Sequence, residues 1–324
     1  MKRALVATIV ASVVALPAIA SATTLRFGHV GGPGSLFEAT ANHFAACVAE
    51  QSEGAVEVQT FGSSQLGNDN ELLQLLRLGQ VDFSLPSTVM SSVDGRFGVF
   101  EMPYIIADRD HMLRVWDTLG DMFQEAAQAN AYHIVGLAEN GFRHITNNIR
   151  PINVPSDLRG IKLRTPAGEW RVRMFREYGA NPTPMALSDV FTALQTGVMD
   201  GQENPYAQIA SSQFQEVQKY LSITNHVYTP AFILASQRHF NAHSEDVQAV
   251  LNDCAAETTT FTYAKAQELE DSLLEVIEAA GVEINEADRD AFVEASQAVF
   301  DAFASEIEGG QELIDTVLGL ADAS

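Results

Sequence analysis

The chain has 324 residues, and its 42 Asp and Glu residues outnumber its 19 Lys and Arg residues, which gives a formal net charge of −23. Such an acidic chain repels nucleic-acid phosphates, so we expect no nucleic-acid partner. Hydrophobic residues make up 46% of the chain and charged residues 19%, which supplies a large core and excludes a disordered chain. The length favours two medium-sized lobes over one large domain.

Residues 1–22 have the pattern of a secretory signal peptide. Lys2 and Arg3 form a basic start, residues 4–15 are apolar, and small residues suited to cleavage follow Pro17. The alternative is an N-terminal membrane anchor, but the run is shorter than the ~20 residues that span a bilayer. We therefore expect cleavage and export, which leaves 17 basic residues against 42 acidic ones and a mature charge of −25.

The first part of the chain alternates strand-like and helix-like segments. Apolar residues at helical spacing predict helices over 37–48 and 69–79. Strands that alternate with helices indicate an α/β architecture with a largely parallel sheet. The predicted strands are 24–28, 55–58, 81–85, 133–137, 143–146, 161–164 and 231–235.

The C-terminal part is predicted to be helical and acidic. Apolar residues keep helical spacing from Val247 to Gly281, which predicts a single helix of roughly 35 residues that bridges two lobes. A second helix is predicted to start from about Asn285, a candidate N-cap. Residues 243–324 hold 20 acidic residues and two basic ones, which indicates a solvated acidic surface.

Two cysteines, Cys47 and Cys254, are far apart in the sequence. Export permits a disulfide between them. Each also lies in an Ala-rich, helix-like stretch, where a buried free thiol is equally expected. The sequence leaves both alternatives open.

Motifs for catalysis and metal binding are missing from the sequence. It contains no Gly-x-Ser-x-Gly and no His-Glu-x-x-His, and the glycine-rich stretch 28–34 matches neither a Walker A loop nor a dinucleotide fingerprint. His29, His144 and His226 have no partner at ligand spacing and are interpreted as structural. We therefore expect a non-enzymatic protein without a metal or cofactor, and an exported hydrolase is the alternative from another class.

Two arginines stand next to predicted strands, Arg143 and Arg164, the second just before Thr165 and Pro166. Ligands of open α/β sheets bind at the carboxyl ends of strands. A guanidinium matches a carboxylate with a planar fork and stays charged at any relevant pH. The pair therefore indicates an anion site, and ordinary salt bridges to nearby acids are the alternative.

At these residues the sequence resembles a known family, the periplasmic solute-binding proteins of TRAP transporters (the DctP-type family). The resemblance covers nearly the whole mature chain, with its blocks in family order. The matching blocks are 63–67 (SSQLG), 97–104 (FGVFEMPY), 163–166 (LRTP), 179–185 (GANPTPM), 193–197 (ALQTG), 200–205 (DGQENP) and 216–220 (EVQKY).

The resemblance implies a two-lobed periplasmic binding protein, type II-like, that closes over its ligand about a hinge, with a long helix spanning both lobes. The implied lobes are 23–141 plus 230–269 and 142–229 plus 270–324. It also implies a monomer in the periplasm that docks on the small and large membrane subunits of a TRAP transporter driven by an ion gradient.

The resemblance assigns roles in the binding site as well. Arg164 matches the carboxylate clamp, Arg143 a second, frequently used arginine, and Asn204 an amide that orients the ligand. Ser87 and Leu187 replace side chains that sialic-acid-binding members carry, so sialic acid is not the expected ligand.

Three further positions are expected to belong to this site. Asp69 retains an acidic side chain. Trp170 either walls the cleft or packs between the lobes. Phe37 is predicted to be a core residue, with pocket lining as the alternative.

The expected function is therefore capture of a small organic acid for uptake. A dicarboxylate or a hydroxylated monocarboxylate, such as a sugar acid, is the leading ligand class. A sulfonate or an aromatic acid on the same arginine is the alternative ligand. An extracytoplasmic sensor subunit that binds the same acid is the alternative function.

Overall fold

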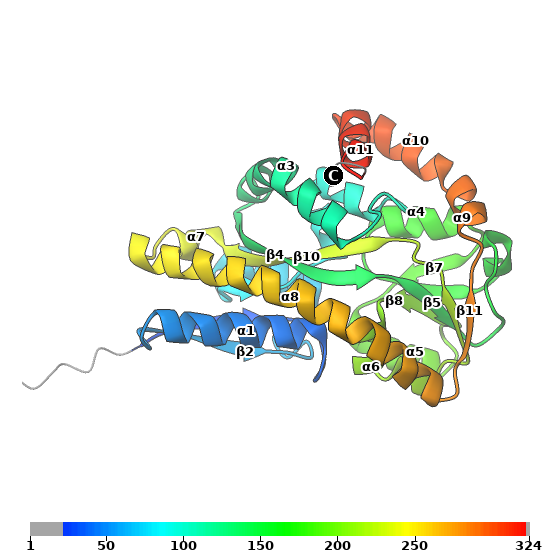
Figure 1. Cartoon of the computed structure of the whole chain (residues 1–324), viewed down its shortest axis with the longest axis horizontal. Helices are drawn as coiled ribbons and strands as arrows, with labels where there is room; N and C mark the ends of the chain where they lie inside the picture. The colour runs from blue at the N-terminus through cyan, green and yellow to red at the C-terminus, as the bar shows by residue number, and fades with distance from the viewer. Residues whose placement is uncertain (1–21, 322–324) are drawn as a thin grey trace, which may run out of the picture.

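The computed structural model describes residues 22–321, so nearly all of the predicted signal peptide lies outside the described residues. The strands form two sheets, one in each lobe (Figure 1). The sheet of lobe I has the order β2 (Val56–Phe61), β1 (Thr23–Gly28), β3 (Phe83–Ser84), β10 (Tyr228–Ser236) and β4 (Tyr132–Phe142). The sheet of lobe II has the order β11 (Glu283–Glu286), β9 (Tyr220–Ile223), β5 (His144–Asn147), β8 (Gly201–Asn204), β6 (Lys162–Thr165) and β7 (Asn181–Pro184).

Both sheets are mixed, which corrects the prediction of a largely parallel sheet. Strand β10 runs antiparallel to β3 and β4, and β5 runs antiparallel to β8 and β9. The reason is that the chain leaves lobe I through β4, enters lobe II through β5 and returns through β10. A returning strand enters its sheet from the opposite end, which an alternation of strands and helices does not reveal.

Helices cover the two sheets and join them. The α-helices are α1 (Leu36–Gln51), α2 (Asp69–Leu78), α3 (Arg109–Gln128), α4 (Glu169–Glu177), α5 (Leu187–Gln195), α6 (Tyr206–Ser211), α7 (Gln237–Phe240), α8 (Glu245–Ala279), α9 (Arg289–Ala295), α10 (Gln297–Glu306) and α11 (Gly310–Gly319). The described part of the chain also has four short 3₁₀ segments, η1 (Thr88–Ser92), η2 (Gly95–Glu101), η3 (Pro155–Leu158) and η4 (Phe214–Glu216). Within residues 22–321, no helix is both long enough and apolar enough to cross a membrane.

Helix α8 is a single 35-residue helix, which confirms the predicted length. The side chain of Ser244 caps its first turn by accepting a hydrogen bond from the Val247 backbone N–H. One half of α8 packs on α1 and β4 of lobe I and the other half on α6 of lobe II, as Figure 1 shows. The helix therefore bridges the lobes as predicted.

The helix predicted from Asn285 starts later. Residues 283–286 form β11, which pairs in parallel with β9 at the edge of the second sheet. Asn285 donates a side-chain hydrogen bond to the Ile152 carbonyl (3.0 Å), and Asp288 caps α9 by accepting from Ala291 N–H. The prediction of Asn285 as the N-cap is wrong because tertiary pairing with β9 overrides the local helix signal.

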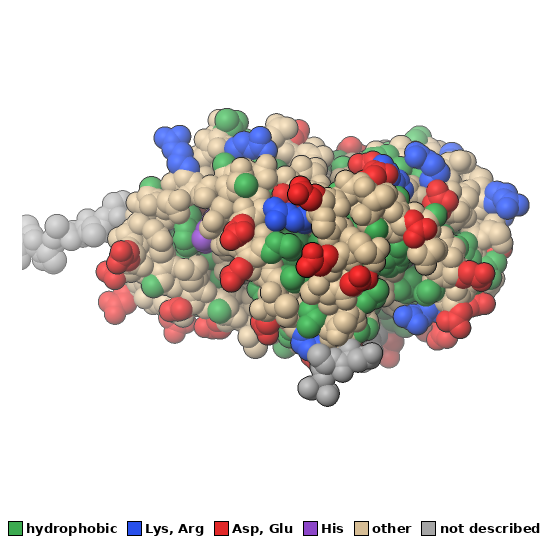
Figure 2. All heavy atoms as spheres, turned by 90° about the horizontal axis from the view of Figure 1, so that it is seen from above, with side chains coloured by type: hydrophobic (Ala, Val, Ile, Leu, Met, Phe, Trp, Pro, Cys, Tyr) green, Lys and Arg blue, Asp and Glu red, His purple; other side chains and the backbone are tan. Residues whose placement is uncertain are grey.

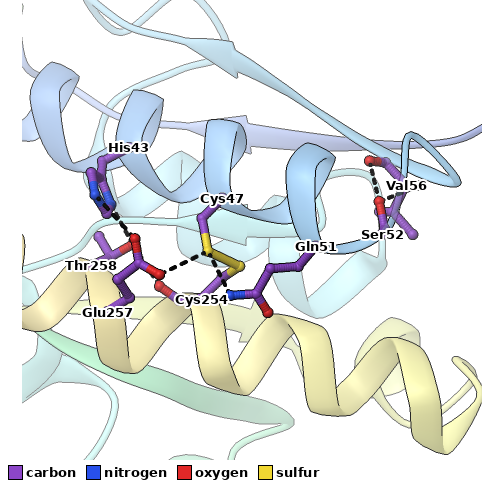
Figure 3. The surroundings of a disulfide bond; sticks show 8 residues. All are labelled: His43, Cys47, Gln51, Ser52, Val56, Cys254, Glu257 and Thr258. Carbon is purple, nitrogen blue, oxygen red and sulfur yellow. Dashed lines mark hydrogen bonds and ion pairs between the residues drawn. A yellow bond between two sulfur atoms is a disulfide. The ribbon is translucent and has the colours of Figure 1, made fainter.

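Cys47 of α1 and Cys254 of α8 form a disulfide that joins positions 207 residues apart (Figure 3). This settles the alternative that the sequence left open. The bond is buried within the apolar cluster that α1 and α8 form on the sheet of lobe I. It fixes the lobe I half of α8 to α1, and the lobe II half of α8 is not cross-linked by it.

Loss of this disulfide is expected to destabilise lobe I. Replacing both cysteines by serine removes a cross-link that restricts the unfolded chain, and the typical cost is about 2–5 kcal/mol. Denaturant unfolding of the double variant and the oxidised wild type measures the difference. Equal unfolding free energies would contradict the expectation, and a reduced wild type should match the variant.

Candidate functional site

A cavity of about 380 Å³ lies between the lobes. An adjoining hollow of about 550 Å³ shares Asp69, Val89, Arg164 and Pro166 with it. The cavity contains seven of the eight predicted site residues, drawn from segments far apart in the sequence. Its lining residues are Val30, Phe37, Asp69, Ser87, Thr88, Val89, Asn140, Arg143, Arg164, Pro166, Leu187, Asn204 and Gln208.

Strand β6 brings Arg164 to the cavity, where the side chain is 3% exposed. Its Nε and Nη2 atoms both donate to the Met185 carbonyl oxygen, at 2.9 and 2.5 Å. Among the described residues, Nη1 has no hydrogen-bond partner. One edge of the guanidinium is therefore anchored, while the end formed by Nη1 and Nη2 keeps N–H groups for a carboxylate. Burial lowers the pKa of Arg164 to about 10, so the group stays charged at neutral pH.

Arg143 lies between β4 and β5, where the chain first crosses between the lobes. Its Nε donates to Glu203 Oε2 at 2.6 Å, and its Nη2 donates to Asn204 Oδ1 at 3.0 Å. The salt bridge considered as the alternative is thus present, and the residue lines the cavity as well. Only Nη1 has no protein partner in the described part of the chain. Arg143 can therefore supply one nitrogen, where Arg164 supplies an open fork.

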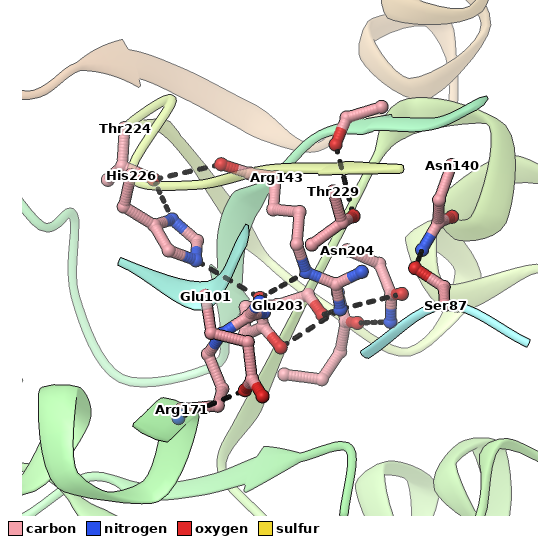
Figure 4. A network of polar contacts seen from close by, with 12 residues as sticks. Ser87, Glu101, Asn140, Arg143, Arg171, Glu203, Asn204, Thr224, His226 and Thr229 are labelled. Carbon is pink, nitrogen blue, oxygen red and sulfur yellow. Dashed lines mark hydrogen bonds and ion pairs between the residues drawn. The ribbon is translucent and has the colours of Figure 1, made fainter. Parts of the chain in front are cut away.

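A buried charge network stands behind Arg143 (Figure 4). Glu203 Oε2 also accepts from Arg171 Nη1 at 2.7 Å and contacts His226 Nε2 at 3.0 Å, and all four side chains are fully or almost fully buried. Burial alone would raise the pKa of Glu203, but the Arg143 and Arg171 guanidiniums hold that pKa well below its usual range. Glu203 is therefore ionised and fixes the orientation of Arg143.

Glu101 extends the network toward lobe I. It is 1% exposed, and its Oε2 accepts from the Arg171 backbone N–H at 3.2 Å. Burial lowers the pKa of His226 to about 4, so its ring is neutral at pH 7. The buried contact of His226 with Glu203 agrees with the interpretation of His226 as a structural histidine. The roles of Glu203, Arg171 and Glu101 were not predicted from the sequence. Strand β8 is too short and too polar for the sequence to indicate that all four of its residues are buried.

A second polar group lines the lobe I side. Ser87 Oγ donates to the Pro230 carbonyl (2.7 Å) and accepts from Asn140 Nδ2 (3.2 Å), so its hydroxyl proton is already engaged. Asn140 Oδ1 is buried and has no partner within residues 22–321. This oxygen is an acceptor that a ligand hydroxyl can satisfy. Asn140 was not among the predicted site residues.

Asp69 is the first residue of α2 and follows the N-cap Asn68. Its partly buried carboxylate lines both the cavity and the adjoining hollow. Burial raises the pKa of Asp69 to about 6, against the opposing effect of the Arg164 guanidinium. The structure therefore places a carboxylate in the same cavity as the two arginines.

Of the three apolar residues predicted for the site, two line the cavity and one does not. Phe37 is 3% exposed, belongs to the lobe I core and also lines the cavity, so both expectations for it hold. Leu187 lines the cavity at the start of α5. Trp170 is not among the lining residues. It packs edge-to-face on Phe303 with ring centroids 5.1 Å apart, which places it in the packing of α4 against α10.

Two α/β lobes, joined by crossing strands and enclosing a cavity with two buried guanidiniums, define a protein that binds a small anion between its lobes. The chain belongs to the bacterial extracellular solute-binding proteins of family 7 (DctP), whose model matches residues 27–306. This confirms the family that the sequence blocks indicated, and the two-lobed fold expected with it.

Relatives with known names or structures extend over almost the whole chain. The C4-dicarboxylate-binding periplasmic protein DctP of Rhodobacter capsulatus is 32% identical, over 96% of this chain and 95% of its own. The sugar-acid-binding protein DctPAm of Advenella mimigardefordensis, solved with galactonate, has a TM-score of 0.89 and 32% identity, covering 93% of this chain and 98% of its own. A TRAP solute-binding protein of Polaromonas, solved with D-erythronate, has a TM-score of 0.88 and 32% identity, covering 91% and 98%.

Proposed function

We propose that this protein is the exported solute-binding subunit of a TRAP transporter and captures a small organic acid between its lobes. The observation that carries the proposal is the pair of buried arginines whose Nη1 atoms have no partner among the described residues of the cavity. Arg164 takes the ligand carboxylate end-on, Arg143 adds one nitrogen, and Asn204 orients the group. The relatives named above bind dicarboxylates or sugar acids, which supports this class of ligand.

Capture proceeds by closure of the lobes. Desolvation inside the closed cleft strengthens the pairing of guanidinium and carboxylate, because the local dielectric is lower than in water. The division into lobe I (23–141 plus 230–269) and lobe II (142–229 plus 270–324) is supported by three crossings between the sheets, from β4 to β5, from β9 to β10 and through α8 to β11. The closed monomer then delivers the acid, chemically unchanged, to the small and large membrane subunits of the transporter.

The proposal includes a periplasmic location. Residues 1–22 direct export to the periplasm and are removed. The buried disulfide supports an oxidising compartment, because disulfides persist there and are rare in the cytosol.

The acidic surface does not oppose this function. Acidic side chains are distributed over both lobes on the face in Figure 2. Exposed charges act over about 8–10 Å at physiological ionic strength, so they do not govern a ligand inside the cleft. There the buried arginines determine which sign of charge is accepted. The net charge therefore bears on solubility, and the cavity decides the ligand.

A thermal-shift screen of carboxylic and sulfonic acids tests the proposal. A cognate acid at about 100 times its dissociation constant should add roughly 2.7 kcal/mol of stability and raise the melting temperature by a few degrees. Calorimetric titration of the hits gives the affinity and confirms unchanged ligand after recovery. If sulfonates stabilise the protein and no carboxylate does, the proposed ligand class is wrong.

A further inference from the structure

The cavity holds a carboxylate of its own beside the two arginines that face the ligand. We propose that Asp69 makes this site selective for polyhydroxy monocarboxylates, the aldonic acids and their relatives, and excludes dicarboxylates of the same length. The inference rests on the proposed function and narrows it. It starts from the balance of charge in the cavity.

The charge balance admits one negative group. The charged side chains lining the cavity in the described structure are Arg143 and Arg164, both positive, and Asp69, which is negative when ionised. Arg143 is already paired with Glu203 at 2.6 Å, and two of its three nitrogens are engaged by protein groups. Glu203 also pairs with Arg171 at 2.7 Å, so Arg143, Arg171 and Glu203 together keep one positive charge. Arg164 and ionised Asp69 balance each other, so one ligand carboxylate neutralises the site and a second leaves it with an excess negative charge.

The position of Asp69 makes the second carboxylate costly. Asp69 and Arg164 both line the cavity and the adjoining hollow, so the two charges lie together where the cavity opens into that hollow. No side chain of the described residues donates a hydrogen bond to the Asp69 carboxylate. A ligand hydroxyl can donate to it, whereas a ligand carboxylate repels it at low dielectric. Burial raises the pKa of Asp69 to about 6 against the lowering effect of the Arg164 guanidinium, so the carboxylate is ionised at pH 7.5.

The remaining polar groups suit hydroxyls. Asn140 is 7% exposed, and its Oδ1 atom is buried and has no hydrogen-bond partner in the described chain. It accepts a hydrogen bond but cannot pair with an anion. Gln208 is 5% exposed and lines the same cavity, where its amide can donate or accept. Asp69 thus provides an acceptor for a ligand hydroxyl beside Arg164, and Asn140 provides a second acceptor in the same cavity.

The test compares acids that differ only at one end of the carbon chain. D-Gluconate and D-glucarate share a carbon chain and the hydroxyls between its ends, as do D-erythronate and meso-tartrate, and the second acid of each pair carries a carboxylate in place of the terminal CH2OH. By calorimetric titration at pH 7.5, the wild type should bind the better monoacid at least about 100-fold more tightly than its matched diacid. Equal affinities within the better pair would overturn the inference.

Asp69→Asn then identifies the group responsible. The amide keeps the shape and can still accept a hydroxyl, so the variant should gain affinity for the diacid and reduce the ratio to about 10-fold or less. Asp189→Asn is the matched control, because it removes the same charge. Asp189 is exposed on α5 and does not line the cavity. An unchanged ratio in Asp69→Asn, or an equal change in Asp189→Asn, would overturn the assignment to Asp69.

The outcomes separate this inference from the proposed function. If no organic acid binds the wild type, the proposed function fails and the selectivity is without meaning. If organic acids bind and the diacids bind as well as the monoacids, the proposed function stands and the role of Asp69 is refuted. A wild-type preference for monoacids that Asp69→Asn removes supports both.

Discussion

Replacing Arg164 by alanine is expected to abolish ligand-induced stabilisation while the unliganded protein stays folded. The variant loses the only open guanidinium fork among the described cavity residues, and the ligand carboxylate is left desolvated without its main partner. Truncating one member of a buried charge pair costs about 2–5 kcal/mol of binding, which corresponds to roughly 30- to 4,000-fold in the dissociation constant. Calorimetric titration with the best acid from the screen measures this loss.

Two further variants make the Arg164 result specific. Arg164→Lys keeps the positive charge and loses the planar fork, so it should bind more weakly than wild type and more tightly than the alanine variant. Arg150 is exposed, and Arg150→Ala removes the same charge without touching the cavity. That control should bind like the wild type. Wild-type affinity in Arg164→Ala would refute the clamp.

The sequence predicts those helices and strands that are determined by the spacing of apolar residues within the segment itself. The helical spacing over 247–281 predicts α8 almost to its ends, and alternation with flanking Gly and Pro predicts β1, β2 and β6 within a few residues. The mixed sheets and β11 depend on where a strand finds its partner. A four-residue polar segment such as 283–286 is a strand only because β9 lies beside it.

The residues of the candidate site likewise fall into those that the sequence could predict and those that depend on tertiary packing. Arg164 and Arg143 could be predicted because a guanidinium beside an apolar strand is unusual enough to suggest a ligand. Glu203 and Arg171 could not, because each alone resembles a solvated charge. They become a buried pair only when β8 and α4 pack together, which places Glu203 Oε2 2.7 Å from Arg171 Nη1. Seven predicted residues meet in one cavity, whereas Trp170, six positions past Arg164, packs on α10.

The network around Glu203 is expected to control stability more than any other charge. Glu203→Gln keeps the size of the side chain and leaves Arg143 and Arg171 buried without their shared counter-charge. Replacing such a network by apolar residues can be neutral, but removing one member leaves uncompensated charge and costs about 3–5 kcal/mol. Here one carboxylate serves two guanidiniums, so we expect the upper part of that range. Denaturant unfolding at pH 7.5 measures the loss.

The pH dependence of that loss follows from the sign of the pKa shift. The pKa of Glu203 lies well below its unfolded value of 4.5. Its ionisation therefore contributes stability that is fully present above pH 4.5 and is lost as the pH falls through the folded pKa. The stability difference between wild type and Glu203→Gln should shrink from pH 7.5 to pH 3.5, because the variant has no such group to protonate. A difference that grows toward acid pH would contradict the assignment.

Glu169→Gln provides the matched control for these measurements. Glu169 contacts Arg173 at 2.6 Å, as close as Glu203 lies to Arg143, but its side chain is 67% exposed. Exposed pairs contribute little because water solvates both partners, so this variant should unfold like the wild type. If Glu169→Gln and Glu203→Gln destabilise equally, burial is not the source of the effect. A large loss confined to Glu203→Gln, together with weaker acid binding, would show that the same buried carboxylate stabilises the fold and orients Arg143 for the ligand.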